Sequence, residues 1–290
     1  MSARLVDEFV AAAARTDDNL PECALLMARV AYPWLDPEPP LGQLRQMGAT
    51  ARAHVDIGLG GAPPRRTRLR VVTDFLYGQL GFTGNQEQYE DPRNSLLNDV
   101  LSRRTGIPVT LAVVLVDVAR AAGLQVEGVN FPGHFLVRCL PDPDDPDDRA
   151  PLLIDPFHAG ALLSEAGCAR LLRAHLGSAA ALDPAMLHAA GKREVLVRML
   201  LNLKRAYVRL RSFAQAHAVT DLLVAFNPGA LDELRDRGLL ASQMGDYAAA
   251  LRDLEDWLQL SSAAADQDRE ETSQVWDHVK SLRRRTASLN

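Results

Sequence analysis

Two histidines and one aspartate are the residues best suited to chemistry in this sequence. His134 opens the segment HFLVRCL, and Asp155 and His158 lie in LLIDPFH. An imidazole that is oriented by a carboxylate can act as a general base. His134 could equally be a hydrogen-bonded histidine of a strand, and Asp155 could cap the turn that begins at Pro156. His158 could join the pair, although a solvent-facing loop position is the favoured interpretation.

The same three side chains raise the question of a metal, because imidazole nitrogens and carboxylate oxygens are zinc ligands. The sequence contains no HExxH motif and no pair of histidines one helical turn apart. We therefore predict neither a metal nor another cofactor. The three cysteines, Cys23, Cys139 and Cys168, are odd in number and widely spaced, so they predict small buried residues rather than disulfides, ligands or nucleophiles.

A second polar cluster lies in the segment EDPRNSLLND and contains Asn94, Ser95 and Asn98. Asn94 and Asn98 are one helical turn apart, so they could satisfy loop backbone groups and cap a helix at residues 95–104. The functional alternative is that both line the same cleft as His134 and donate hydrogen bonds to a carbonyl or carboxylate.

The elements that must position these residues can be predicted from hydrophobic periodicity. VTLAVVLVDVARAAG is apolar around nearly its whole circumference, with Pro108 before it and Gly123 at its end, which predicts a buried central helix. Three segments with strand character follow, and this order favours an antiparallel sheet packed on that helix. If residues 134–140 and 151–157 pair about a centre near 145 or 146, His134 and Asp155 lie opposite or diagonal on one face.

Helices are predicted on both sides of this core. Before it, helical spacing covers residues 3–33, 41–57 and 69–81, with linkers rich in proline or glycine at DPEPP and at 58–66. After residue 194 only helical patterns remain. There, LKRAYVRLRSFAQAHAVTDLLVAFNP and DRGLLASQMGDYAAALRDLEDWLQLS match each other at an offset of 34 residues, the period of tetratricopeptide repeats, and QVWDHVKSLRRR adds a final helix.

Composition describes an ordinary globular chain. Apolar residues make up 47% and charged residues 24% of 290 residues, and the formal net charge is −5. An acidic chain has no global attraction to phosphate backbones or anionic lipid, so nucleic-acid and membrane partners are not expected. The first residues lack the apolar stretch of a signal peptide, and no window is long and apolar enough for a membrane span, so we expect a cytoplasmic protein.

Four motifs resemble the transglutaminase-like superfamily and, more closely, the bacterial SirB-type proteins, which carry C-terminal tetratricopeptide repeats. They are ALLMARVAYPWLD, FTGNQEQYEDPRNSLLNDVLSRRTGIPVTLAVVLVDVARAAGL, VEGVNFPGHFLVR and LLIDPFHAG, and the resemblance covers roughly residues 20–260. It implies a papain-like α+β core. It also implies that a catalytic cysteine would fall at residues 108–110, where this chain has Pro108, Val109 and Thr110.

These observations lead to one organisation and several functions. We predict an α+β transglutaminase-like domain at residues 1–180, whose first 80 residues are a helical subdomain, and an all-α tetratricopeptide-like array at 190–285. Without a thiol at residues 108–110, the leading hypothesis is a pseudoenzyme, a regulatory or scaffold protein that binds a protein or peptide near Thr110, Asn94 and His158. The alternatives are a non-thiol hydrolase or amidase that uses His134 and Asp155, and a purely structural His–Asp pair. The sequence leaves the partner and the oligomeric state open.

Overall fold

The computed structural model describes residues 3–58, 63–143, 145, 148–261 and 269–289. It divides into two compact units, residues 12–199 and residues 1–11 together with 200–290. The predicted linker at 58–66 and the segment between the two strands predicted to pair, residues 141–150, lie partly outside the described residues. None of the described helices combines the length and apolarity that crossing a bilayer requires.

The first unit is built around helix α6, Pro108–Ala121, whose residues from Pro108 to Val116 are all buried. Such an all-round apolar helix needs neighbours on every side. Helices α2 (Leu20–Ala28), α3 (Glu38–Gly58), α4 (Arg65–Thr73) and α5 (Leu97–Arg103) pack against it, as do strands of the main sheet. The predicted buried central helix is therefore confirmed.

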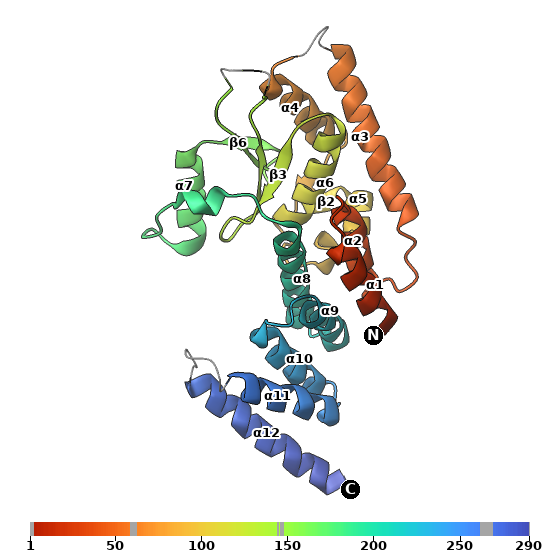
Figure 1. The fold of residues 1–290 in the computed structure, drawn as a ribbon, viewed down its shortest axis with the longest axis vertical. Coiled ribbons are helices and arrows are strands. Elements are labelled where there is room, and N and C mark those ends of the chain that lie inside the picture. Colours follow the sequence, from red (N-terminus) through yellow and green to blue (C-terminus); the bar gives the residue numbers. More distant parts are fainter. Residues whose placement is uncertain (1–2, 59–62, 144, 146–147, 262–268, 290) are drawn as a thin grey trace. The chain divides into compact units, whose positions relative to one another are not determined.

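The main sheet is an antiparallel meander in the order β3-β4-β5-β6. Its strands are Val126–Val129, Leu136–Cys139, Leu152–Asp155 and Ala161–Leu163. Val137 pairs with Ile154, so the β4–β5 hairpin has the predicted register. Figure 1 shows α6 and α7 (Glu165–Leu176) on opposite sides of this sheet. The α7 side is closed by a cluster that includes Leu136, Leu153 and Leu172.

Several elements differ from the predictions. Residues 3–33 form two helices, α1 (Ala3–Ala14) and α2, because the polar segment between them turns. The predicted helix at 69–81 begins at Arg65 and widens into a π-helix at Asp74–Gln79. The helix predicted at 95–104 is a 3-10 turn, Pro92–Asn94, followed by α5. Strand β6 and a two-residue parallel pair, β1 (Thr83–Gly84) with β2 (Thr105–Gly106), were not predicted.

The helical region begins with α8, Lys192–Arg209, and continues through α9 (Phe213–Phe226), α10 (Leu231–Gln243), α11 (Tyr247–Ser261) and α12 (Arg269–Leu289). Within the second unit, α10 packs on α9 and on α11, and α12 packs on α11. Trp257, Val275 and Val279 are buried in the core that joins α11 to α12. The helical character predicted for both segments and for the final helix is confirmed.

Candidate functional site

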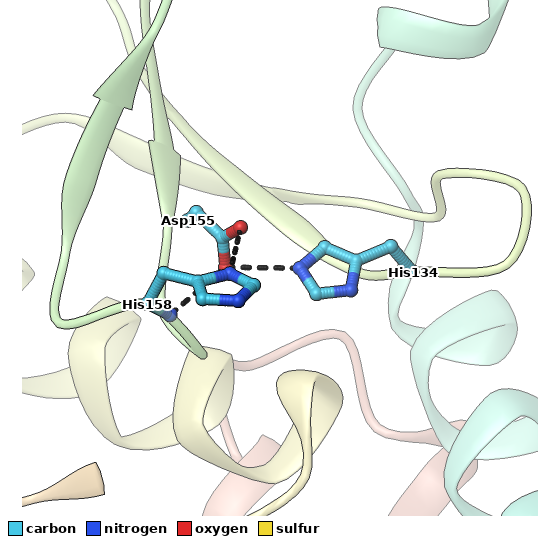
Figure 2. Close-up of side chains that lie close together, drawn as sticks. All are labelled: His134, Asp155 and His158. Carbon is cyan, nitrogen blue, oxygen red and sulfur yellow. Dashed lines mark hydrogen bonds and ion pairs between the residues drawn. The ribbon is translucent and has the colours of Figure 1, made fainter. Parts of the chain in front are cut away.

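Asp155, the last residue of β5, is the centre of a three-residue cluster that we call the His–Asp–His trio: His134, Asp155 and His158 (Figure 2). Nε2 of His134 lies 2.9 Å from Oδ1 of Asp155, and Nδ1 of His158 lies 2.8 Å from Oδ2. A carboxylate only accepts, so each imidazole carries its proton on the nitrogen that faces Asp155. His158 lies half-exposed in the turn after β5, as the favoured interpretation expects, and its ring also contacts Asp155, as the alternative expects.

Both predicted roles of Asp155 are present at once. Besides the contact with His134, Oδ1 accepts hydrogen bonds from the backbone amides of Phe157 at 2.9 Å and His158 at 3.2 Å. The carboxylate therefore caps the turn after β5 and orients an imidazole. This turn folds locally because an aspartate side chain readily accepts from amides two residues further along the chain.

The β4–β5 register explains why His134 reaches Asp155. The pairing of Val137 with Ile154 places Leu136 across from Asp155 in the same register, which makes His134 the diagonal neighbour. His134 itself precedes β4, in a turn closed by its amide donating to Phe131 at 3.0 Å. Gly133 in that turn has φ +73°, a conformation that glycine adopts without strain.

Burial and the neighbouring imidazoles shift the pKa of Asp155 in opposite directions. Burial alone would raise its pKa, but the hydrogen bonds and charge interactions with His134 and His158 lower it below its ordinary value. The carboxylate is therefore ionised at neutral pH. The His134 side chain is only 4% exposed, whereas that of His158 is 49% exposed, so solvent reaches the trio from the His158 side.

The environment of His134 contains two rings that sequence reasoning missed. His175, on α7, stacks on His134 with ring centroids 5.8 Å apart, and Phe157 meets His134 edge-on at 6.0 Å. Burial lowers the pKa of His175, and the charge interaction with His134 lowers it further. Phe157 was adjacent to a predicted residue, but His175 lies 41 positions from His134, and nothing in its local sequence indicates the contact.

A third missed residue, Tyr77, comes from the π-helix. A Cβ atom at Gly160 would lie 2.8 Å from the Tyr77 ring, so this ring packs directly on the turn that follows Asp155. Burial and the charge of Asp155 raise the pKa of Tyr77 well above its ordinary value. π-helical turns recur at functional sites, but an α-helical periodicity cannot predict one.

The second predicted cluster is a separate, buried network. The side-chain nitrogen Nδ2 of Asn94 donates to the backbone oxygens of Gln88 at 2.7 Å and Tyr89 at 3.2 Å. The Thr110 hydroxyl donates to the backbone oxygen of Asn94 at 2.6 Å. The prediction that Asn94 satisfies loop backbone groups is confirmed. The predicted cap by Asn94 and Asn98 is wrong, because α5 begins after Leu96 and has no side-chain cap.

The structure brings together only part of the predicted site. Among the described hydrogen bonds, none joins Asn94, Ser95 or Asn98 to the trio. Ser95 is buried, and the buried Oδ1 of Asn98 has no hydrogen-bond partner among the described residues. One link between the two clusters is a contact of neighbouring rings. Tyr89, whose backbone oxygen accepts from Asn94, meets Phe157, which precedes His158, edge-on with ring centroids 5.9 Å apart. A shared cleft stays a prediction.

Thiol groups occupy positions unsuited to nucleophilic attack. All three cysteines are buried, and burial raises the pKa of Cys23 and of Cys139 to about 11, which keeps both protonated at neutral pH. Burial also raises the pKa of Cys168. The prediction that the cysteines are small buried residues is confirmed.

Comparison with known proteins agrees with this architecture. Residues 40–201 match the model of the transglutaminase-like superfamily, and residues 203–275 match the model of the tetratricopeptide repeat. A UPF0162 protein of Xylella fastidiosa is 38% identical over 250 residues, which cover 84% of this chain and 85% of that protein. The chain belongs to the transglutaminase-like superfamily and to the UPF0162 family.

Other relatives extend this similarity. A UPF0162 protein of Vibrio cholerae is 31% identical over 188 residues, which are 65% of this chain and 67% of that protein. F-box only protein 21 of the mouse is 34% identical over 137 residues, 47% of this chain but 21% of the mouse protein. The predicted transglutaminase-like fold with a repeat region is thereby confirmed, whereas the SirB-type name and the domain limits 1–180 and 190–285 stay predictions.

Proposed function

We propose that this UPF0162-family member is a regulatory or scaffold protein that binds a protein or peptide, on a transglutaminase-like domain without a thiol nucleophile. The observation that carries the proposal is the state of Thr110. Its side chain is fully buried, and its hydroxyl donates to Asn94 and accepts from the Ile107 amide at 3.2 Å. A hydroxyl engaged in capping α6 serves the fold, and its high pKa makes it a poor nucleophile without an adjacent base.

The repeat region supports the same proposal, because stacked helical repeats provide extended surfaces for other chains. Two tryptophans are exposed, Trp276 on α12 in the helical unit and Trp34 in the unit of residues 12–199, with relative exposures of 43% and 96%. Tryptophan is enriched among residues that dominate binding energy at protein interfaces. These two side chains therefore form a matched pair for locating a binding surface.

The test begins with selection of peptides on the full-length chain from a random library, followed by titration by fluorescence anisotropy. We expect peptides with Kd below about 100 µM, and a loss of affinity of at least about tenfold in Trp276→Ala with little change in Trp34→Ala. The reverse pattern would place binding on the unit of residues 12–199. Failure to obtain any saturable peptide binding would contradict the proposal.

One observation favours a second candidate, a non-thiol hydrolase or amidase. When the neutral ring of His134 points Nε2–H at Asp155, Nδ1 carries the lone pair, and no described hydrogen bond occupies that nitrogen. A buried base in this state can activate water. Mass spectrometry of the selected peptides after incubation tests it: cleavage that Asp155→Asn abolishes and Thr110→Ser retains supports a hydrolase, and intact peptides contradict one.

A further inference from the structure

We propose that the His–Asp–His trio is a binding site for a divalent transition metal of the Zn²⁺ class. One ligand atom from each of His134, Asp155 and His158 lies within 4.8 Å of the other two, and no metal is needed to bring them there. Two imidazole nitrogens and one carboxylate oxygen form a donor set that Zn²⁺ uses in sites with three protein ligands and one open position. The proposal goes beyond the peptide-binding function and does not depend on it.

The geometry allows a metal to take the place of two protons. The facing atoms are 2.9 Å apart between His134 and Asp155 and 2.8 Å apart between His158 and Asp155. Ligand atoms around a tetrahedral zinc are about 3.4 Å apart, given bonds of about 2.0–2.2 Å. Each contact with Asp155 must therefore open by roughly half an ångström, and the two imidazole nitrogens, which lie within 4.8 Å of each other, must reach the same spacing. His158 can supply this movement, since its side chain is 49% exposed.

The charges also fit. Each imidazole can move its proton to its other ring nitrogen, Nδ1 of His134 and Nε2 of His158, so the facing nitrogens become free lone pairs without either ring losing its neutrality. The carboxylate of Asp155 brings one negative charge toward the cation. In the metal-free state these protons are shared with the carboxylate, which explains why the trio is stable without an ion.

The surroundings orient Asp155 and enclose the ring of His134. Outer hydrogen bonds that fix a ligand's orientation are typical of such sites. The amides of Phe157 and His158 hold Oδ1 of Asp155, and the rings of His175 and Phe157 enclose His134. The exposed side at His158 leaves a path for an ion and for the water that fills a fourth position. The prediction of no metal rested on helical motifs, which do not describe ligands from a turn and a strand.

The test titrates the untagged, full-length chain with Zn²⁺ by calorimetry and with Co²⁺ by visible absorption. We expect one equivalent to bind with Kd in the micromolar range or below. His158→Ala should weaken binding at least about 100-fold, since loss of even an outer-shell partner costs 10–100-fold. Asp155→Asn should weaken metal binding to a similar extent. Its amide oxygen can still accept hydrogen bonds from the amides of Phe157 and His158, and circular dichroism checks that the variant keeps its fold.

The matched control is His188→Ala, which removes an exposed histidine outside the trio and should leave affinity unchanged. The proposal is overturned if the wild-type chain shows no saturable binding below about 100 µM, if His158→Ala binds as well as wild type, or if His188→Ala loses as much. None of these outcomes depends on whether a peptide partner is found, so the two proposals fail separately.

Discussion

At the scale of single residues, the environment of His134 depends on atoms that are close in space and distant in sequence. Gly133 has φ +73°, and a Cβ atom built there would lie 2.5 Å from the Cβ of His175. The glycine is therefore required twice, for its backbone conformation and for the close approach of α7. Gly81 offers a comparison, since its φ is +74° and nothing lies within 4 Å of its added Cβ.

Gly133→Ala should lower the free energy of unfolding by about 2–4 kcal/mol, the sum of backbone strain and overpacking. Gly81→Ala should cost about 1–2 kcal/mol, because only the strain applies. Urea unfolding of the two variants measures the difference. Equal losses would show that His175 does not press on the turn at Gly133.

A second prediction concerns Asp117, half-buried on α6. Burial raises the pKa of Asp117, with Asp18 adding to the shift and Arg120 opposing it. A carboxyl with a raised folded-state pKa binds its proton more tightly in the folded chain, so stability falls as pH rises from the unfolded value of about 3.9 through the folded value.

Asp117→Asn should remove the loss of stability that ionisation of Asp117 causes at neutral pH, because the asparagine amide stays neutral. The variant should have a higher Tm than wild type at pH 7, and this advantage should disappear at pH 3, where the carboxyl is protonated in both states. Thermal unfolding followed by circular dichroism at both pH values measures it. The exposed Asp7 supplies the control: Asp7→Asn should show no such pH-dependent gain.

At the scale of elements, Arg65 joins the start of α4 to the β4–β5 hairpin. Its side chain is 5% exposed, and its guanidinium donates to the backbone oxygens of Cys139 at 2.8 Å and Ala150 at 2.9 Å and pairs with Asp148. Those partners lie at the end of β4 and shortly before β5. One buried side chain therefore fixes both ends of the connection that sets the register under His134 and Asp155.

Arg65→Met should cost about 3–5 kcal/mol, because it leaves the Asp148 carboxylate without its buried partner. The neighbouring Arg66 is exposed, and Arg66→Met should change stability by no more than about 0.5 kcal/mol. Urea unfolding measures both. If the two variants were equally stable, Arg65 could not be what holds the hairpin to α4.

At the scale of the whole molecule, the first residues of the chain group with its last helices. Residues 1–11 form one unit with residues 200–290. Within that unit the fully buried Phe9 of α1 meets Phe226 of α9 edge-on, with ring centroids 5.5 Å apart. The first helix therefore contributes to the core of the helical unit.

Phe9→Ala should destabilise that unit by about 3–5 kcal/mol, the usual cost of emptying a buried phenylalanine site. Hydrogen exchange should rise in α9, residues 213–226, and stay unchanged in β5, residues 152–155. The exposed Arg4 supplies the control, since Arg4→Ala removes only a surface ion pair with Glu8. Unchanged exchange in α9 would contradict the assignment of α1 to this unit.

The sequence by itself determined the features that local patterns encode. An all-round apolar run has to be a buried helix, so α6 could be predicted. Pairing residues 134–140 with 151–157 about a centre near 145 or 146 gave the β4–β5 register that the structure shows, because consecutive strands joined by a short connection pair as a hairpin. That register was enough to predict that His134 and Asp155 are neighbours.

Tertiary structure alone decided the rest. The two-residue strands β1 and β2 are too short for any periodic signal, and their parallel pairing is non-local. The stacking of His175 on His134 and the packing of Tyr77 on the turn after Asp155 join segments that are far apart along the chain. Such contacts depend on how helices dock on a sheet, which no local period records, so the environment of the trio became visible only in the folded chain.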